Sequence, residues 1–330
     1  MASPPPGTVV VAPDKFKGTL SAPTVAAALA EGFAAIGVEA VMLPVADGGD
    51  GTAATLAAAG SGELVATSAH DALGRPVEAE LALLDDGKTA VVDVAAASGL
   101  WRLAEQERDA WRATSAGTGE LIAAAIARGA ETVIVAAGGS ATSDGGAGAI
   151  EALGPGPLPA RLLVACDVRT TWEEAAPVFG PQKGMEPSNL PRLQARMDAL
   201  AARLPRDPRG RPLTGCAGGL SGALWSQYGA ELVPGGDLVL DALGFDARLA
   251  GAALVVTGEG RIDDQTLHGK AVAAVAARCR RAGVPCAAVV GRNELTPAAQ
   301  QALGLWRVLE AGDEEALRAA AGALWPPPSS

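Results

Sequence analysis

Four polar turns rich in glycine, aspartate and lysine each follow directly on a short apolar segment, and a single aspartate ends a fifth such segment. The turns are PDKFKGT, ADGGDGT, GGSATSDGG and GEGRIDD, and the aspartate is Asp167 in LLVACD. Short valine-rich segments of this kind predict buried strands. In an open α/β sheet the carboxyl ends of the strands line the ligand-binding crevice. We therefore expect an α/β fold in which these turns, although distant in sequence, converge on one cleft.

Strands and helices alternate at both ends of the chain. At the N-terminal end, residues 9–12 and 40–45 are predicted strands, and Ser21 is a candidate N-cap for the helix between them. From residue 252 the alternation returns, with predicted strands at 253–257, 286–290 and 305–309. Strands in two separated blocks predict one doubly wound sheet, flavodoxin-like or Rossmann-like, made from both ends of the chain.

The middle of the chain has a different pattern. ELVATS, VEAELALLD and KTAVVDV are strand-like runs separated by short turns, which predicts antiparallel pairing; residues 205–212 are a connection rich in proline and arginine. The predicted fold class is α/β with two α/β domains. Residues 1–62 and 250–330 form the discontinuous doubly wound domain, and residues 63–249 form an inserted α/β domain with a mixed sheet.

The charge of the chain argues against several classes of partner. Its 330 residues carry a formal net charge of −11, which repels nucleic acids and anionic membranes. No apolar run reaches the about 18 residues of a membrane span, and MASPPPG does not resemble a signal peptide, so we expect a soluble cytoplasmic protein. Four cysteines without a C-x-x-C spacing predict buried free thiols.

The composition of the turns suits phosphoryl transfer, which requires glycine for close backbone approach, hydrogen-bond donors, carboxylates and a few cations. GGSATSDGG, residues 138–146, is the best candidate phosphate-binding loop because it opens a predicted helix. The alternative is a tight turn in which a side chain of the loop caps that helix. The candidate cofactor-binding residues are Gly138, Gly139, Ser140, Thr142, Asp144, Gly48 and Gly49.

Carboxylates in the turns are candidates for a general base and for metal ligands. Asp47 and Asp50 flank two glycines and would coordinate Mg²⁺ or cap the following helix, with Asp50 the better candidate for a cap. Asp167 ends an apolar strand, a position typical of a base or a metal ligand, although a strand-terminal aspartate also initiates turns.

The turn GEGRIDD concentrates charged side chains. They are Glu259, Arg261, Asp263 and Asp264, with His268 and Lys270 just beyond. A cluster of surface salt bridges is one interpretation, but Gly258 and Gly260 favour a loop that approaches a ligand. Only five of the 26 basic residues are lysines, and four of these (Lys15, Lys17, Lys183 and Lys270) lie in glycine-rich or turn-like segments, which suits phosphate contacts.

Several familiar signatures are missing. The chain has neither the Walker sequence G-x-x-x-x-G-K-[ST] nor the dinucleotide fingerprint after residues 9–12, and its serines lack the G-x-S-x-G frame of a hydrolase. The two histidines are far apart in sequence, which disfavours a histidine-rich metal site.

The motifs, taken together, resemble those of the class I bacterial glycerate kinases. APDKFKGTLSA, PVADGGDGT, AAASGL, TSAGTGELI, GGSATSDGGAG, ACDV, VFGPQKG, AGGLSGAL and VVTGEGRIDDQTLHGK occur in that family's order and cover most of the chain. The chain departs from the family in a short connection between Leu153 and Leu162 and in the segment RTTWEEAAP after ACDV. The resemblance implies two α/β domains with a cleft between them, phosphate transfer from MgATP to D-glycerate, and most often 2-phosphoglycerate as the product.

The predicted mechanism is in-line attack of the glycerate hydroxyl on the γ-phosphorus of ATP, with Mg²⁺ as the second cofactor. Asp167 is the first choice for the base and Asp47 the second, both are candidate metal ligands, and Lys15 is a further catalytic candidate. The candidate substrate-binding residues are Lys17, Arg261, Glu259 and Asp263. A kinase of another small hydroxy acid and a non-catalytic ligand sensor are the alternatives, and phosphorylation of the 2- or the 3-hydroxyl and a homodimer stay open.

Overall fold

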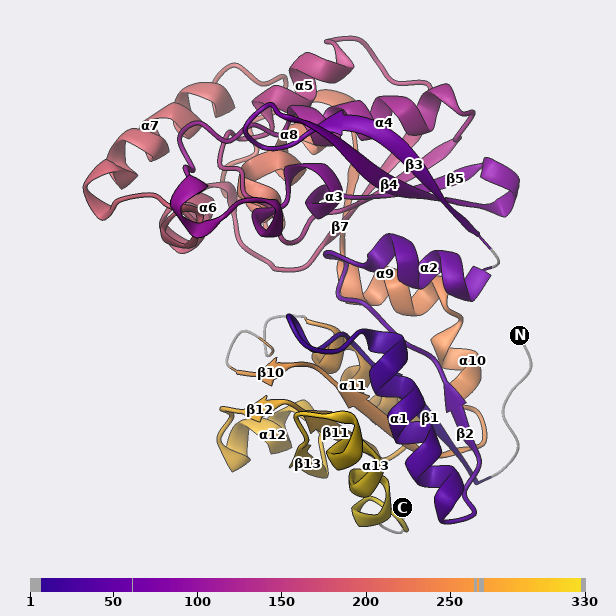
Figure 1. Cartoon of the computed structure of the whole chain (residues 1–330). Coiled ribbons are helices and arrows are strands. Elements are labelled where there is room, and N and C mark those ends of the chain that lie inside the picture. The colour runs from indigo at the N-terminus through magenta and orange to yellow at the C-terminus, as the bar shows by residue number, and fades with distance from the viewer. Residues whose placement is uncertain (1–6, 61, 264–265, 267–269, 328–330) are drawn as a thin grey trace. The chain divides into compact units, whose positions relative to one another are not determined.

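The computed structural model describes residues 7–60, 62–263, 266 and 270–327. It forms two compact units, the first made of Met1–Asp47 and Gly236–Ser330 and the second of Gly48–Gly235. Figure 1 shows the elements of both. The predicted α/β fold class is confirmed, because each unit is built on a β-sheet with helices packed against it.

A five-stranded parallel sheet forms the centre of the first unit. In the order in which they pair, the strands are β13 (Arg307–Glu310), β11 (Cys286–Val290), β9 (Ala252–Gly258), β1 (Thr8–Pro13) and β2 (Ala40–Met42). Because β1 pairs with β9 on one side and β2 on the other, both ends of the chain build one sheet, as predicted. The short strands β10 (Arg261–Ile262) and β12 (Arg292–Asn293) pair separately.

Helices cover this sheet on both faces. The helices of the first unit, among which α1 and α11 pack on the strands, are α1 (Ala22–Ala35), α9 (Gly235–Ala242), α10 (Phe245–Leu249), α11 (Ala271–Ala282), α12 (Pro297–Leu303) and α13 (Glu314–Ala323). Helices α1 and α13 pack on each other and share a core with Val9, Val11 and Val256. Val10 and Val255, which alternate with them and point to the other face, are also fully buried. The predicted N-cap is confirmed, because Ser21 Oγ accepts a hydrogen bond from the backbone N–H of Thr24 at 3.2 Å.

A buried arginine ties α9 and α10 to α11. Arg278 is 7% exposed, and its guanidinium lies 2.6 to 3.2 Å from the carboxylates of three aspartates, Asp237, Asp241 and Asp246. The aspartate side chains are 50 to 69% exposed, so water screens part of each attraction. Without Arg278 the three negative charges would repel one another across the helix ends.

We expect Arg278→Ala to lower the free energy of unfolding by about 1 to 3 kcal/mol, through lost packing and lost charge neutralisation. Arg318→Ala is the matched control, because Arg318 also pairs with two carboxylates but is 44% exposed. Its expected cost is within about 1 kcal/mol. Urea denaturation of both variants measures the difference, and equal costs would show that Arg278 contributes no more than a surface ion pair.

A six-stranded mixed sheet forms the centre of the second unit. In pairing order its strands are β3 (Glu63–His70), β4 (Pro76–Leu84), β5 (Thr89–Asp93), β6 (Thr132–Ala136), β7 (Arg161–Cys166) and β8 (Glu231–Pro234). Strand β4 is antiparallel to both β3 and β5, as the three strand-like runs predict, and β5 to β8 are parallel. The inserted mixed sheet is therefore confirmed, but β8 was not predicted.

The helices of the second unit pack between and beside these strands. They are α2 (Thr52–Gly60), α3 (Val94–Ser98), α4 (Ala116–Ala127), α5 (Ala147–Leu153), α6 (Trp172–Phe179), α7 (Leu190–Ala201) and α8 (Leu220–Tyr228). One core joins the central strands to α4 and α8, and a smaller cluster around the fully buried Trp172 joins α6 to α7. All four cysteines are buried and free, as predicted.

The limits of the two units differ from the predicted ranges. The first boundary lies within the ADGGDGT turn, because α2 packs on β3, β4 and β5 of the second unit. The second lies at Gly235, because α10 contacts β9 and α11 of the first unit. An alanine-rich helix such as α2 has no sequence pattern that says which sheet it covers.

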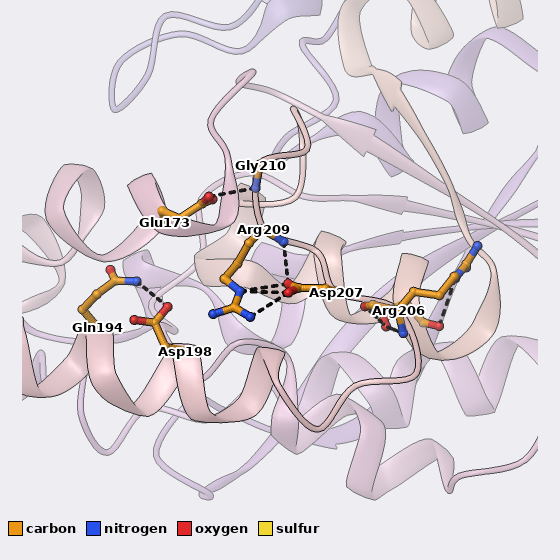
Figure 2. A network of polar contacts seen from close by, with 8 residues as sticks. Glu173, Gln194, Asp198, Arg206, Asp207, Arg209 and Gly210 are labelled. Carbon is orange, nitrogen blue, oxygen red and sulfur yellow. Dashed lines mark hydrogen bonds and ion pairs between the residues drawn. The ribbon is translucent and has the colours of Figure 1, made fainter.

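Arginine side chains hold the connection over residues 205–212, which is rich in proline and arginine (Figure 2). Arg206 donates to backbone carbonyls at the end of α8 and stacks 4.3 Å from the Trp225 ring centre. Arg209 forms a bidentate pair with Asp207, and the backbone N–H of Gly210 donates to Glu173 at 2.8 Å.

In the part of the chain that the structure describes, no helix has both the length and the apolar character needed to cross a membrane.

Candidate functional site

Two of the turns singled out in the sequence, and Asp167, meet at the carboxyl ends of β6 and β7. A Cβ atom on Gly138, which follows β6, would lie 2.6 Å from Cα of Gly49 and 2.9 Å from Oδ2 of Asp167, the residue after β7. A side chain at position 138 is therefore excluded by the backbone of the ADGGDGT turn and by a carboxylate. These two turns and Asp167 therefore lie together within the second unit, whereas convergence of all four turns on one cleft stays a prediction.

Lys183 contributes a cation where these segments meet; the sequence analysis noted it among the lysines that suit phosphate contacts but assigned it no role in the site. It lies in the 3₁₀ turn Pro181–Lys183, is 3% exposed, and donates from Nζ to Ser140 Oγ at 2.9 Å and to the carbonyl of Thr142 at 2.6 Å. Burial lowers the pKa of Lys183 to about 8, and the charges of Asp167 and Asp144 oppose this shift. The scarcity of lysines and its place in VFGPQKG were the signals that could have identified it.

Asp144, predicted to contact phosphate, uses its carboxylate to hold the loop itself. It accepts hydrogen bonds from the backbone N–H and the hydroxyl of Ser115 at 2.9 and 2.8 Å, and from the backbone N–H groups of Gly146 and Gly148 at 3.1 Å each. The alternative interpretation of Asp144 as a capping residue therefore accounts for these contacts. Its carboxylate accepts hydrogen bonds from the loop, so the donors to a phosphate must come from other residues.

Two hydroxyl side chains of the loop are held by contacts with other parts of the second unit. Thr142 Oγ1 lies 3.4 Å from the carbonyl oxygen of Ala217 and Ser140 Oγ receives the Lys183 ammonium, so both side chains are fixed. Among the described residues, the buried hydroxyl of Ser143 has no hydrogen-bond partner. A buried hydroxyl without a partner is costly, and a phosphate oxygen is one group that would accept its hydrogen bond.

Asp93 caps the helix for which the sequence analysis considered Asp50. Its carboxylate, at the end of β5, accepts from the backbone N–H of Gly51 at 2.8 Å and of Ala53 at 3.0 Å, at the start of α2. This cap comes from another strand, so no local pattern in ADGGDGT could reveal it. The cap fixes the ADGGDGT turn, including Gly48 and Gly49, against the sheet.

A second cluster of charged groups lies at the carboxyl ends of β1 and β9 in the first unit. Burial, and then the negative charge of Asp47, raise the pKa of Asp14 well above its usual range, and Glu259 adds to the effect. Asp14 belongs to PDKFKGT but was not selected from the sequence. Three carboxylates that repel one another, Asp14, Asp47 and Glu259, favour a cation or a shared proton at this place.

Glu259 is the anchor of the GEGRIDD turn. It accepts a hydrogen bond from Thr266 Oγ1 at 2.7 Å and lies 3.7 Å from the Lys270 ammonium. Burial raises its pKa to about 7, and Lys270 and Thr266 limit the shift. Arg261 is 58% exposed and pairs with Asp263 at 3.1 Å, so the two predicted substrate-binding side chains neutralise each other.

The ionisation of Glu259 should be visible in the stability of the protein. Its pKa is raised from 4.5 to about 7 on folding, so its contribution to stability is present at low pH and is lost as the pH rises through 7. Between pH 5 and pH 8 the wild type should therefore lose about 2 to 3 kcal/mol relative to Glu259→Gln. Glu294→Gln is the control, and urea denaturation at both pH values is the measurement. A loss of the same size relative to both variants would refute the assignment.

The remaining predicted residues are placed as follows. Lys15 is half-buried beside Asp14, whose carboxylate accepts its backbone N–H at 2.6 Å. Lys17 is exposed, and its backbone nitrogen would lie 3.0 Å from a Cβ on Gly260, so the PDKFKGT and GEGRIDD turns are in contact. Asp264 and His268 lie outside the described residues.

The two predicted metal ligands belong to different units, Asp47 to the first and Asp167 to the second. Within the described ranges, no group of three or more histidine, cysteine, aspartate or glutamate side chains is arranged to hold a metal ion. Mg²⁺ is commonly held by one or two carboxylates together with phosphate oxygens and water. The residues present fit that kind of site and not a cage made of protein ligands alone.

Comparison with known proteins identifies the family to which the chain belongs. A sequence model described as "Glycerate kinase family" matches residues 9–159 and 157–321. Glycerate kinase of Bacillus subtilis is 39% identical over 325 residues, covering 86% of this chain and 84% of the relative. Glycerate 2-kinase of Escherichia coli is 36% identical over 322 residues, with the same coverage of 86 and 84%. A crystal structure from Salmonella typhimurium LT2 assigned as glycerate kinase 2 has a TM-score of 0.79 and 36% identity, and covers 97% of this chain and 95% of that one. The chain belongs to the glycerate kinase family and is an enzyme of that activity.

Proposed function

We propose that the enzyme transfers the γ-phosphoryl group of MgATP to the 2-hydroxyl of D-glycerate and gives 2-phosphoglycerate. The observation that carries this proposal is the arrangement of Asp167, the buried Lys183 and two glycine-rich turns at the ends of β6 and β7. Membership in the glycerate kinase family supports the substrate. The E. coli relative named glycerate 2-kinase supports the position of phosphorylation.

In this proposal Asp167 accepts the proton of the attacking hydroxyl, with Asp47 as the second candidate. The hydroxyl must lose its proton as its oxygen bonds to phosphorus, and Asp167, a half-buried carboxylate at a strand end, would accept it. The Lys183 ammonium neutralises charge that develops on the transferred phosphoryl group. Mg²⁺, with Asp47 or Asp167 as a ligand, would supply further neutralisation of the phosphate oxygens.

Two further sets of residues bind the substrates in this proposal. Backbone N–H groups of Gly138 and Gly139, with Ser140 and Thr142, bind the phosphates. Lys15, Lys17 or Arg261 in the first unit binds the carboxylate of glycerate or the γ-phosphate. Asp263 orients Arg261 through their ion pair, and Glu259 and Asp263 both lie near the Lys270 ammonium, at 3.7 and 3.8 Å.

Release of ADP from MgATP, measured by a coupled assay on D-glycerate, tartronate and related hydroxy acids, tests the proposal. The expected result is the highest kcat/KM with D-glycerate. A higher kcat/KM with another acid would reassign the substrate. That result is expected if the short connection between α5 and β7 opens the pocket to a different hydroxy acid. Calorimetric binding of ATP or glycerate without ADP production would identify a sensor and refute the proposal.

A further inference from the structure

Trp101 is the most exposed large hydrophobic side chain among the described residues, at 64%. It lies in the 3₁₀ turn Leu100–Arg102, directly after α3. An indole ring in water forgoes the free energy that burial of an apolar surface provides. None of the roles proposed above uses this side chain.

The indole is nevertheless held in a fixed position. Its Nε1–H donates to the carbonyl of Ala95 at 3.0 Å, and the guanidinium of Arg102 stacks 4.6 Å from the ring centre. Arg102 is itself fixed, because Nε donates to the carbonyl of Ala96 at 2.7 Å and Nη2 to that of Glu78 at 2.9 Å. A ring immobilised in this way loses little conformational entropy when a ligand stacks on it.

The residues that hold Trp101 also contact the glycine-rich loop at the end of β6. The backbone N–H of Leu100 donates to the carbonyl of Gly139 at 2.9 Å, and Gly99 and Ser140 form a β-bridge. Ala95 accepts the indole N–H through its carbonyl, and its methyl group lies 3.3 Å from the place of a Cβ on Gly139. The residues that precede and hold the exposed ring therefore contact the proposed phosphate-binding loop, and all these contacts are within the second unit.

We infer that Trp101 is the stacking platform for the adenine base of ATP. A ligand that places phosphates on the loop of residues 138–146 and also carries a flat aromatic group is a nucleotide. An exposed, immobilised indole held by residues that contact that loop is the surface on which such a base stacks. The inference rests on the proposed use of ATP and adds the residue that binds the base.

Calorimetric titration with ATP and with inorganic tripolyphosphate separates binding of the base from binding of the phosphates. Trp101→Ala should weaken ATP binding by roughly 5- to 150-fold, the range measured for base–aromatic stacking. Affinity for tripolyphosphate should be unchanged, and Trp101→Phe should retain most of the affinity for ATP. Trp306→Ala is the matched control, because Trp306 is also exposed, at 36%, and has Arg307 beside its ring.

Unchanged ATP affinity in Trp101→Ala would overturn the inference, and so would an equal loss for ATP and tripolyphosphate. A change of oligomeric state on sedimentation, seen in Trp101→Ala but not in Trp306→Ala, would assign the ring to a protein interface and overturn it as well. If the wild type binds neither ATP nor tripolyphosphate, the proposed function fails, and the inference fails with it. If the wild type binds ATP and only the Trp101 prediction fails, the proposed function stands.

Discussion

Asp167→Asn should reduce kcat by about 10²- to 10⁴-fold, the usual contribution of a positioned general base. The amide keeps the shape of the carboxylate but does not accept the proton of the substrate hydroxyl. KM for ATP should change less than kcat, because proton transfer belongs to the transition state and not to nucleotide binding. Steady-state kinetics in a coupled ADP assay gives both constants.

Asp207→Asn is the matched control for this variant. Asp207 is a carboxylate of the same unit that pairs with an arginine on the surface, at 2.6 Å from Arg209. Its replacement should leave kcat within experimental error of the wild type. Circular dichroism and thermal unfolding must show that Asp167→Asn is folded. A folded Asp167→Asn variant with a near-normal kcat would remove Asp167 from the mechanism and make Asp47 the first candidate.

Lys183→Met should lower kcat/KM by about 10²-fold or more, because it removes a buried positive charge from the place where phosphoryl charge develops. The shape of the pH profile gives the sharper result. With a pKa of about 8, the Lys183 ammonium loses its proton as the pH rises, so kcat/KM of the wild type should fall on the alkaline side near pH 8. Lys183→Met should have low activity without this alkaline limb.

Lys88→Met is the control, because Lys88 is an exposed lysine in the same unit and its replacement should leave the pH profile unaltered. A merely structural role for Lys183 would lower activity and stability together but would not move the limb. An alkaline limb near pH 8 that persists in folded Lys183→Met would show that another group titrates there.

The strand ends could be predicted from the sequence because they depend on local patterns. Valine-rich segments such as residues 9–12 are recognisable alone, and the rule that ligands bind at the carboxyl ends of parallel strands then brings Gly138 and Asp167 together. The parallel pairing of β1 with β9 is also implied by two blocks of alternating strands and helices. These conclusions require no knowledge of distant contacts.

The role of Lys183 was not assigned, and Asp93 was missed, because both roles depend on contacts with segments remote in sequence. The Lys183 ammonium reaches residues more than 40 positions away, and Asp93 caps a helix that begins 41 residues earlier. Asp144 illustrates the opposite case, since a loop that suits phosphate binding uses one of its carboxylates for its own backbone. Strand β8 was missed because its sequence, ELVP, is too short to show alternation.

Phosphorus NMR of the product, recorded without proton decoupling, tests the central claim most directly. D-Glycerate, Mg²⁺ and ATP are incubated with the wild type, and the signal of the new phosphate ester is examined. Phosphorylation of the 2-hydroxyl places one proton on the ester-bearing carbon, so we predict a doublet and an equal amount of ADP. A triplet, from the two protons of the 3-position, would contradict 2-phosphorylation, and the absence of any new ester would contradict ATP-dependent phosphorylation of glycerate.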